Sequence, residues 1–226
     1  MLPWIELATA TAPQGGAIRL LRRGDEFSIR LEGGNELMNS RLSGSEEALA
    51  TLAFDRLGGR RAPRFLIGGL GMGFTLRAAQ TVAPPDALLI VSEILPDLID
   101  WATRHMKTVF GDCLSDPRVE VRAGDVGASI SEATAAFDAI LLDVDNGPDG
   151  LSRVGNDALY SEAGLLSARK ALTTGGVLAV WSAAPDQSFS KRVARCGFDI
   201  RTQTVRASRT KRGARHTIWI AVRTDG

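Results

Sequence analysis

The chain has 226 residues, of which 44% are hydrophobic and 23% are charged, and its formal net charge is +1. These values fit one globular domain of ordinary size with a small appendage, and they exclude an overall field that would draw the chain to nucleic acid or to an anionic membrane. Because no run approaches the roughly 20 apolar residues of a membrane span, we expect no membrane partner.

Residues 1–42 have a pattern of their own. They begin without the basic region and long apolar stretch of a signal peptide, which favours a cytoplasmic protein. Two β-like runs flank Arg23-Gly24-Asp25 and predict a hairpin over residues 17–33. We expect a small N-terminal β segment over residues 1–42 and a larger domain over residues 43–226. The edge of this segment is a place where two copies could pair, so a homodimer is one prediction.

A helix is predicted from Ser43 onward. Ser43 and Glu46 have the spacing of a capping box, in which each side chain accepts a hydrogen bond from the backbone N–H of the other residue. Apolar residues between positions 48 and 57 recur at helical spacing and form one face. The pair Gly58-Gly59 is expected to end the helix.

Strands and helices alternate through the rest of the chain. We expect strands over residues 64–68, 87–92, 118–122, 137–142, 177–181, 199–205 and 217–222, and helices over 75–80, 96–106, 164–172 and 187–196. The pair Gly175-Gly176 is expected to stop the helix 164–172. The buried-looking strands predict an α/β fold with a doubly wound, mostly parallel seven-stranded sheet of the class I methyltransferase type, ending in an antiparallel hairpin.

A cluster of glycines separates the strand 64–68 from the helix 75–80. Gly68, Gly69, Gly71 and Gly73 occupy four of six positions. Glycine permits positive φ and brings the backbone close to a ligand without a Cβ clash. Between a strand and a helix N-terminus, such a loop can seat a ligand. Tight packing of helix on strand, without any ligand, is the alternative.

Two acids follow the next two strands. Glu93 ends the strand 87–92, where a carboxylate can accept hydrogen bonds from both hydroxyls of a ribose. Asp125, next to Val126, follows the strand 118–122 and is expected to face an adenine ring. The alternatives are a helix cap for Glu93 and an Asx turn for Asp125.

The nature of these side chains favours one class of ligand. Acids at both positions, without a Walker lysine, argue against a phosphate-rich ligand and suit a nucleoside with a sulfonium charge. We therefore predict that the glycine loop, Glu93, Asp125 and Val126 bind S-adenosylmethionine or its decarboxylated form as a co-substrate.

Two further acids, Asp143 and Asp145, follow the strand 137–142. Ligands of open α/β sheets bind at this edge, so one acid could accept a proton from an amine while the other holds the amine or the sulfonium. The alternative is that both decorate a turn. No His or Cys accompanies them, and Cys113 and Cys196 stand outside metal-ligand spacing, so we expect no metal and free thiols.

Some aromatic and basic residues have more than one possible role. Tyr160 could line the substrate pocket or pack the loop, and Trp181 could edge the pocket at the end of its strand. His105 and His216 have no partner by spacing and are expected on the surface or in a hairpin. The arginines and lysine between positions 206 and 215 are expected in a solvated loop, with RNA contact as the minority interpretation.

These motifs together resemble the spermidine synthase (aminopropyltransferase) family from about Pro13 to Val222. "FLIGGLGMG" is similar to the family's strand and glycine loop, "VSEILPDLIDWA" to its ribose-binding strand end, and "SDPRVEVRAGD" and "FDAILLDVDNGP" to its adenine and catalytic segments. The resemblance implies that Asp143 is the catalytic acid. It also implies that Gln14 contacts the ligand.

Departures from the family's pattern fall on the diamine side. The resemblance places Gly71 where the family has an acid in the loop, and Leu49 and Thr51 near its substrate-contacting tyrosine and following acid. Asp145 comes one place early, and Asn146 takes the slot of the family's second acid. A diamine needs carboxylates near both ends, so we predict that putrescine is not the acceptor.

The function predicted from the sequence is therefore transfer of an alkyl group, aminopropyl or methyl, to a small amine-type acceptor. A plain methyltransferase is one alternative. A non-catalytic binding or dimerisation module on the same fold is another, and an RNA-modifying enzyme is a third. The partner we expect is a small-molecule substrate, and nucleic acid is disfavoured.

Overall fold

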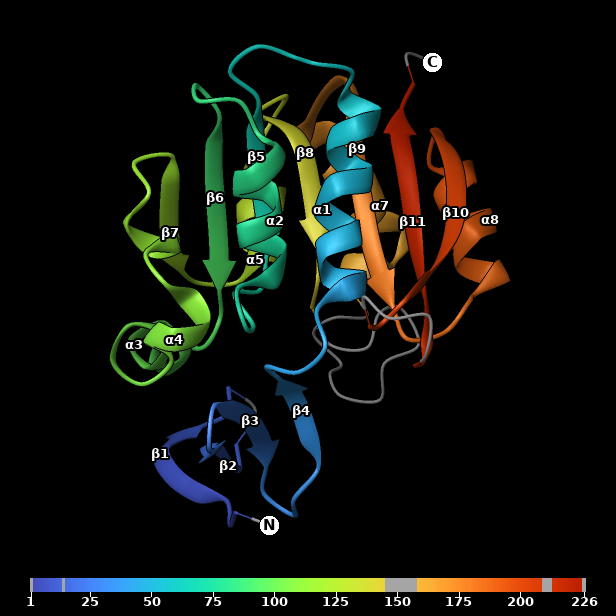
Figure 1. The fold of residues 1–226 in the computed structure, drawn as a ribbon. Helices are drawn as coiled ribbons and strands as arrows, with labels where there is room; N and C mark the ends of the chain where they lie inside the picture. The colour runs from blue at the N-terminus through green and yellow to red at the C-terminus, as the bar shows by residue number, and fades with distance from the viewer. Residues whose placement is uncertain (1, 14, 145–157, 209–212, 225–226) are drawn as a thin grey trace.

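The structure is a computed structural model that describes residues 2–13, 15–144, 158–208 and 213–224. It contains two β-sheets, and the smaller one is N-terminal (Figure 1). Its four antiparallel strands pair in chain order: β1 (Ile5–Thr11), β2 (Ala17–Arg23), β3 (Glu26–Leu31) and β4 (Glu36–Asn39). The predicted hairpin corresponds to β2 and β3. Strands β1 and β4 enlarge it to a sheet, and β4 is too short to show a clear alternation in the sequence.

The larger sheet confirms the predicted fold class. Its seven strands have the order β10-β11-β9-β8-β5-β6-β7, and β11 is antiparallel to both of its neighbours while β5 to β9 pair in parallel. The strands are β5 (Arg64–Gly68), β6 (Leu88–Glu93), β7 (Val119–Ala123), β8 (Phe137–Leu142), β9 (Leu172–Ser182), β10 (Phe198–Arg206) and β11 (Arg215–Arg223).

Helices cover both faces of this sheet (Figure 1). Helices α1 to α4 contribute to one apolar cluster, and α5, α7 and α8 contribute to the other. They span α1 (Gly44–Leu57), α2 (Phe74–Val82), α3 (Pro96–Arg104), α4 (Lys107–Phe110), α5 (Val126–Ser131), α7 (Glu162–Ala171) and α8 (Gln187–Arg195). Alternate residues of β5 divide between the clusters: Phe65 and Ile67 join the first, and Leu66 joins the second. This is why the central strands β5, β6 and β8 are mostly apolar without alternation, whereas the outer strands β7 and β10 carry polar residues.

The predicted capping box at the start of α1 is wrong. Ser43 is the N-cap residue, but its side chain makes no capping hydrogen bond. The Glu46 carboxylate instead accepts a bond of 2.7 Å from the hydroxyl of Ser45. At the other end of the helix the prediction holds, because Gly58 adopts the left-handed conformation with φ of 65°.

The prediction for Gly175-Gly176 is also wrong. Helix α7 already ends at Ala171, and β9 starts with Leu172. The two glycines lie inside β9, where the pairing with β8 shifts between Phe137 and Ala139. A Cβ on Gly176 would lie 2.8 Å from the carbonyl oxygen of Thr173, so the glycines serve a strand irregularity and not a helix end.

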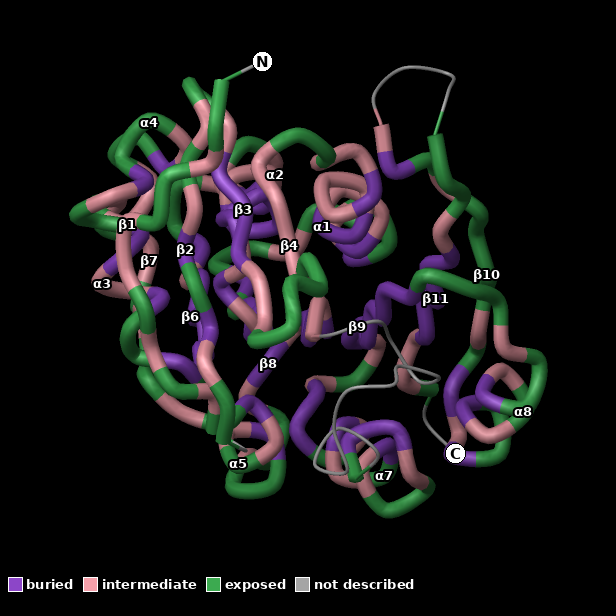
Figure 2. The backbone as a smooth tube through the Cα atoms, turned by 90° about the horizontal axis from the view of Figure 1, so that it is seen from below, coloured by how far each residue is buried: buried purple, intermediate pink, exposed green. Residues whose placement is uncertain are grey.

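The carboxyl ends of the parallel strands face the N-terminal sheet. The chain continues outward from β5 to β6 and β7 in one direction, and from β8 to β9 in the other, so the order reverses between β5 and β8. Ligands of open α/β sheets bind at such a reversal, outside the carboxyl ends of the strands. Figure 1 shows β1 to β4 beyond these ends, and the view from below in Figure 2 shows β3 and β4 lying across them.

Three findings bear on other predictions. No helix in the described part of the chain is long and apolar enough to cross a membrane. Cys113 and Cys196 are both free. The described residues contain no group of three or more His, Cys, Asp or Glu side chains placed to hold a metal ion.

Candidate functional site

A cavity of about 320 Å³ lies at the carboxyl ends of the parallel strands. Its floor is the loop after β5 together with the ends of β6, β7 and β8, and strands β2 to β4 supply part of its wall. The volume falls at the lower end of the range for small-molecule sites. The N-terminal sheet therefore completes a site that the main sheet begins.

The glycine loop takes its shape from the protein's own packing at two of its positions. A Cβ on Gly69, whose φ is 88°, would lie 2.9 Å from the carbonyl oxygen of Asp143. A Cβ on Gly73, whose φ is 72°, would lie 2.6 Å from the ring of Phe110. Gly71 differs, because its nearest neighbour would be the Met38 sulfur at 3.9 Å. Gly69 and Gly71 line the cavity, so packing and ligand access each explain part of the loop.

Glu93 joins the glycine loop to the start of α3. Its side chain is 5% exposed, and its two oxygens accept hydrogen bonds of 2.8 Å from the backbone N–H groups of Leu70 and Leu95. The carboxylate lines the cavity while holding the loop on one side and the turn before α3 on the other. Each carboxylate oxygen has a second lone pair, so contact with a ribose remains a prediction that this geometry permits.

Asp125 and Val126 occupy the wall beyond β7. Asp125 is the N-cap of α5 and accepts a hydrogen bond of 2.8 Å from the backbone of Gly127. This is the Asx-type role expected as the alternative, but the exposed carboxylate also lines the cavity. Val126 is buried and packs about 3.1 Å from the Cβ position of Gly68. Both residues therefore reach the same space as Glu93.

Asp143 lies directly after β8, where the order of the strands reverses. Its carboxylate accepts a hydrogen bond of 2.6 Å from the hydroxyl of Thr75, in the first turn of α2. The residue lines the cavity, and burial raises the pKa of Asp143 above its ordinary value, although the bond from Thr75 acts in the opposite direction. The N-terminus of α2 likewise favours the ionised form of this carboxyl.

Glu46 is the acid that the sequence interpretation did not place in the site. It projects from the first turn of α1 into the cavity that Asp143 also lines. Its pKa is raised to about 7, first because of burial and second because of the Asp143 carboxylate. The charge of Asp143 therefore acts on Glu46, almost a hundred residues away in the chain, at one end of the cavity.

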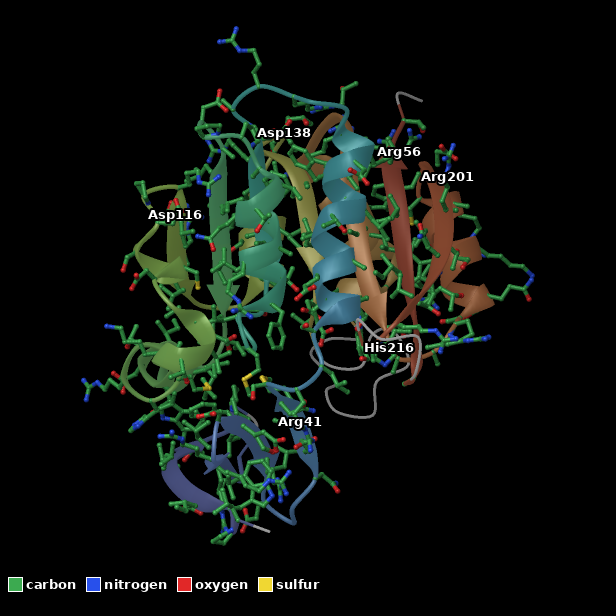
Figure 3. All side chains as sticks on the ribbon, in the orientation of Figure 1. Arg41, Arg56, Asp116, Asp138, Arg201 and His216 are labelled. Carbon is green, nitrogen blue, oxygen red and sulfur yellow. The ribbon has the colours of Figure 1, made fainter. Side chains whose placement is uncertain are left out.

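A short polar chain leads from Glu46 to His216. The Ser45 hydroxyl lies 2.7 Å from Glu46 Oε2 and 2.8 Å from His216 Nδ1. The His216 ring meets the Trp181 ring edge to face, with centroids 4.7 Å apart, and both rings line the cavity. Burial lowers the pKa of His216, which favours the neutral ring near pH 7. Figure 3 shows His216 at the lower edge of the sheet, whereas Asp138 lies at the opposite edge.

The charge of the cavity has one sign. Its described lining contains five acids, Glu36, Glu46, Glu93, Asp125 and Asp143, and neither lysine nor arginine. Glu36 is neutralised by Arg41 at 2.9 Å on the N-terminal sheet. Of the other four, Asp125, Glu93 and Asp143 lie at strand ends, and Glu46 lies at the start of α1. Such a lining favours a ligand that carries positive charge.

The structure sorts the predicted site residues into three groups. The cavity brings together Gly69, Gly71, Glu93, Asp125, Val126, Asp143 and Trp181, while Gly68 and Gly73 shape the loop from behind. Tyr160 packs edge to face on Phe189 in the second apolar cluster and is absent from the described lining, which favours its packing role. Gln14 and Asp145 lie outside the described residues.

Two residues of the site were not predicted from the sequence. Glu46 was interpreted as a cap. His216 was expected on the surface or in a hairpin, and it does lie in the β10–β11 hairpin, but its place in the cavity lining was not predicted. The only sequence feature that could have placed Glu46 in the site is its position at the predicted helix start. For His216 no sequence feature indicates a place in the site, because it is a lone histidine in a hairpin strand. The strand register brings His216 to the site, because β11 pairs Thr217 with Ser182, next to Trp181.

Two solved structures share this fold. One is a spermidine synthase in complex with the transition state analogue AdoDATO, with a TM-score of 0.74, and the other is a spermidine synthase from Thermotoga maritima, with a TM-score of 0.75. Each is 18% identical in sequence, and each match covers 96% of this chain and 72% of the other. No protein-family model matches the chain. No curated protein matches it in sequence either. At this identity the likeness establishes a spermidine synthase-like fold.

Proposed function

We propose that this protein is a transferase that takes an alkyl group from an S-adenosylmethionine-type sulfonium and attaches it to a small amine. The observation that carries the proposal is the cavity lining, whose described part holds five acids and neither lysine nor arginine at the carboxyl ends of the parallel strands. A sulfonium and an amine are both cations, so both would be stabilised there. The fold shared with spermidine synthases supports the same class of reaction.

The decarboxylated donor fits this lining better than S-adenosylmethionine itself. The intact donor carries a carboxylate, which needs a cation or an open helix N-terminus. The described lining holds neither lysine nor arginine, and the N-terminus of α2 already faces Asp143 through Thr75. A second carboxylate beside Asp143 and Glu46 would be repelled. Aminopropyl transfer is therefore the leading form of the proposal, and methyl transfer is the alternative.

Donor atoms are assigned to the half of the cavity under β5, β6 and β7. Glu93 is proposed to hold the ribose, and Asp125 and Val126 are proposed to meet the adenine. The backbone at Gly69 and Gly71 would lie along the alkyl chain, because neither residue has a side chain to block it. These positions follow one another along the order of the strands, as the parts of a nucleoside would.

The acceptor is assigned to the other half, beside Asp143 and Glu46. Trp181, whose ring packs on His216, lines the cavity at this end, and strand β4 adds Leu37 and Met38 to the lining. A diamine such as putrescine would bring its second charge against apolar side chains, which is costly. The arrangement therefore supports an acceptor with one ammonium group and an apolar remainder.

The chemistry asked of the protein is mainly positioning. The amine attacks the carbon next to sulfur, the new C–N bond forms as the C–S bond breaks, and the electron pair stays on sulfur as a neutral thioether. Asp143 is proposed to hold the cationic centre in line, and a nearby carboxylate must take the proton that the amine loses. Orientation and fixed negative charge are effective in a site of this kind.

Isothermal calorimetry with three ligands tests the donor assignment. We expect decarboxylated S-adenosylmethionine and methylthioadenosine to bind, and S-adenosylmethionine to bind at least about tenfold more weakly, a difference of about 1.4 kcal/mol. Stronger binding of the intact donor would instead support a methyltransferase. Absence of binding by all three would overturn the proposal and favour a non-catalytic module.

A further inference from the structure

The two acids of the acceptor end have different connections. Asp143 is fixed between the ends of β5 and β8: its backbone N–H donates to Gly68 at 3.2 Å, and its carboxylate is held by Thr75, which is 4% exposed. Glu46 is instead joined through Ser45 to His216, whose ring is only partly buried. When Glu46 takes up a proton, the hydrogen bonds of Ser45 and His216 can change direction. Asp143, in contrast, is held by Thr75 and by the backbone of Gly68.

We infer that Glu46 is the catalytic residue that accepts the proton of the acceptor ammonium, and that Ser45 and His216 position its carboxylate. This inference rests on the proposed function. Asp143 then remains the fixed anion beside the reacting carbon. Removal of the proton frees the nitrogen lone pair for attack, so the proton passes to Glu46 and the sulfonium charge passes to the new ammonium product.

The geometry leaves one oxygen of Glu46 for this task. Ser45 donates to Oε2, and no other side chain among the described residues donates a hydrogen bond to the Glu46 carboxylate. The side chain lines the cavity, so an ammonium held by Asp143 lies within the same enclosed space. A base is most effective when its pKa lies near the working pH, and the raised pKa of Glu46, about 7, meets that condition.

The direction of the hydrogen bonds links Glu46 to the state of His216. Ser45 has one proton, and when Glu46 is ionised that proton points to Oε2, so the Ser45 oxygen must accept from His216 Nδ1. When Glu46 is protonated it can donate to Ser45, which then donates to Nδ1. His216 is thus expected to carry its proton on Nδ1 above pH 7 and on Nε2 below it.

Other charges near Glu46 act in known directions. Among the described residues, Asp143 after β8 and Glu47 on α1 raise the pKa of Glu46, while the Ser45 hydroxyl lowers it. From α2 the nearest polar neighbour is the uncharged Thr75, which also lies 3.3 Å from the Glu46 carbonyl oxygen. From β11 the titratable neighbour is His216, through Ser45. Loss of Ser45 should therefore move the Glu46 pKa upward.

Nuclear magnetic resonance of the full chain tests the link without any substrate. The chain has two histidines, and a His105→Gln variant identifies the signals of His216 in ¹⁵N-histidine-labelled protein. We expect the proton of His216 to move from Nε2 to Nδ1 with a midpoint near pH 7 as the pH rises. Glu46→Gln should abolish this step, and Glu47→Gln, on the same helix, should leave it in place.

Kinetics test the catalytic role. Release of methylthioadenosine from decarboxylated S-adenosylmethionine is measured with n-butylamine, phenethylamine and putrescine as probes. We expect an acid limb near pH 7, a fall in kcat of about 100-fold or more in Glu46→Gln without that limb, and a shift of the limb to higher pH in Ser45→Ala. Glu47→Gln should keep the wild-type kcat and the limb, with the limb moved slightly to lower pH because Glu47 is the weakest of the causes that raise the pKa of Glu46.

The outcomes separate the two proposals. No release by the wild type with any probe would overturn the proposed function and this inference with it. Release that Glu46→Gln leaves unchanged would overturn this inference alone, and the proposed function would stand. A His216 signal that ignores Glu46→Gln would remove the positioning role of Ser45 and His216, while the pH profile of kcat would still decide the role of Glu46.

Discussion

The two ends of the cavity are built by different means. At the proposed donor end, Glu93 and Asp125 come from the tips of neighbouring parallel strands, and backbone N–H groups hold both carboxylates. At the proposed acceptor end, Glu46, Asp143 and His216 come from a helix start, a strand end and an antiparallel strand. Their partners include side-chain hydroxyls and an aromatic ring.

This difference indicates where the chemistry can vary. Backbone bonds tie the donor end to the fold itself, so changes there should affect binding and stability together. The acceptor end is a set of mutually dependent side chains whose pKa values are displaced from their ordinary range. Changes there should alter turnover and pH dependence more than folding, as expected for groups with displaced pKa values in a cleft.

Asp143→Asn gives the largest effect and tests whether the acceptor end can fail alone. We expect turnover to fall about 1000-fold, because the fixed negative charge beside the reacting centre is lost. Binding of methylthioadenosine, which carries no positive charge, should change by less than about threefold, a difference of under 1 kcal/mol. Calorimetry and single-turnover assays measure both quantities. Equal losses in both would mean that the two ends do not act separately.

Gly73→Ala tests whether the loop depends on packing. A Cβ at this position combines positive φ with a contact of 2.6 Å to the Phe110 ring, which is 2% exposed. The expected loss in the free energy of unfolding is about 4 kcal/mol. The matched control is Gly71→Ala, with φ of 52° and only the Met38 sulfur within 4 Å of the added Cβ, at 3.9 Å, for which we expect about 1 kcal/mol. Urea unfolding would contradict this account if the two losses were equal.

Glu46→Gln tests the electrostatic cost of the acceptor end. The pKa of Glu46 is about 7 in the folded chain against an ordinary 4.5. Between these values the unfolded chain ionises first, so stability falls as the pH rises and the full penalty is present above pH 7. The neutral variant Glu46→Gln does not have the cost of ionising a buried carboxyl. After allowance for partial exposure, it should be more stable than the wild type by about 2 kcal/mol at pH 8 and should differ little from it near pH 4.5.

Thermal unfolding at the two pH values measures this difference. Glu47→Gln is the control on the same helix and should show no comparable change with pH. A Glu46→Gln variant that is less stable than the wild type at pH 8 would mean that the carboxylate is held by interactions stronger than its desolvation, and the description of the acceptor end would have to change.

Glu93→Gln gives the smallest effect and tests the donor end. An amide offers one accepting oxygen where the carboxylate offers two, so either Leu70 or Leu95 loses its acceptor. We expect donor affinity to fall about tenfold and stability to fall by about 1 to 2 kcal/mol together. Glu120→Gln, on the exposed strand β7, should change neither quantity. A loss of affinity with stability unchanged would place Glu93 purely in ligand contact.

The sequence by itself was enough to predict the fold class, the mostly parallel sheet with its antiparallel end, and the acids that follow the parallel strands. Parallel strands end on the same side of the sheet, so acids that follow neighbouring strands lie close together, and Glu93, Asp125 and Asp143 line one cavity. The glycine loop was predicted because four glycines lie between a strand and a helix. The homodimer, the ribose and adenine contacts and the catalytic role of Asp143 stay predictions.

Tertiary structure decided the acceptor end and the irregular positions. Spacing could assign Ser43 and Glu46 to a capping box, but only packing against the sheet turned Glu46 toward Asp143. Likewise, Gly175 belongs to β9 and His216 faces Trp181 because of pairings between strands far apart in the chain. Local patterns report short-range preferences, whereas the register and burial that set these contacts arise only when distant segments pack together.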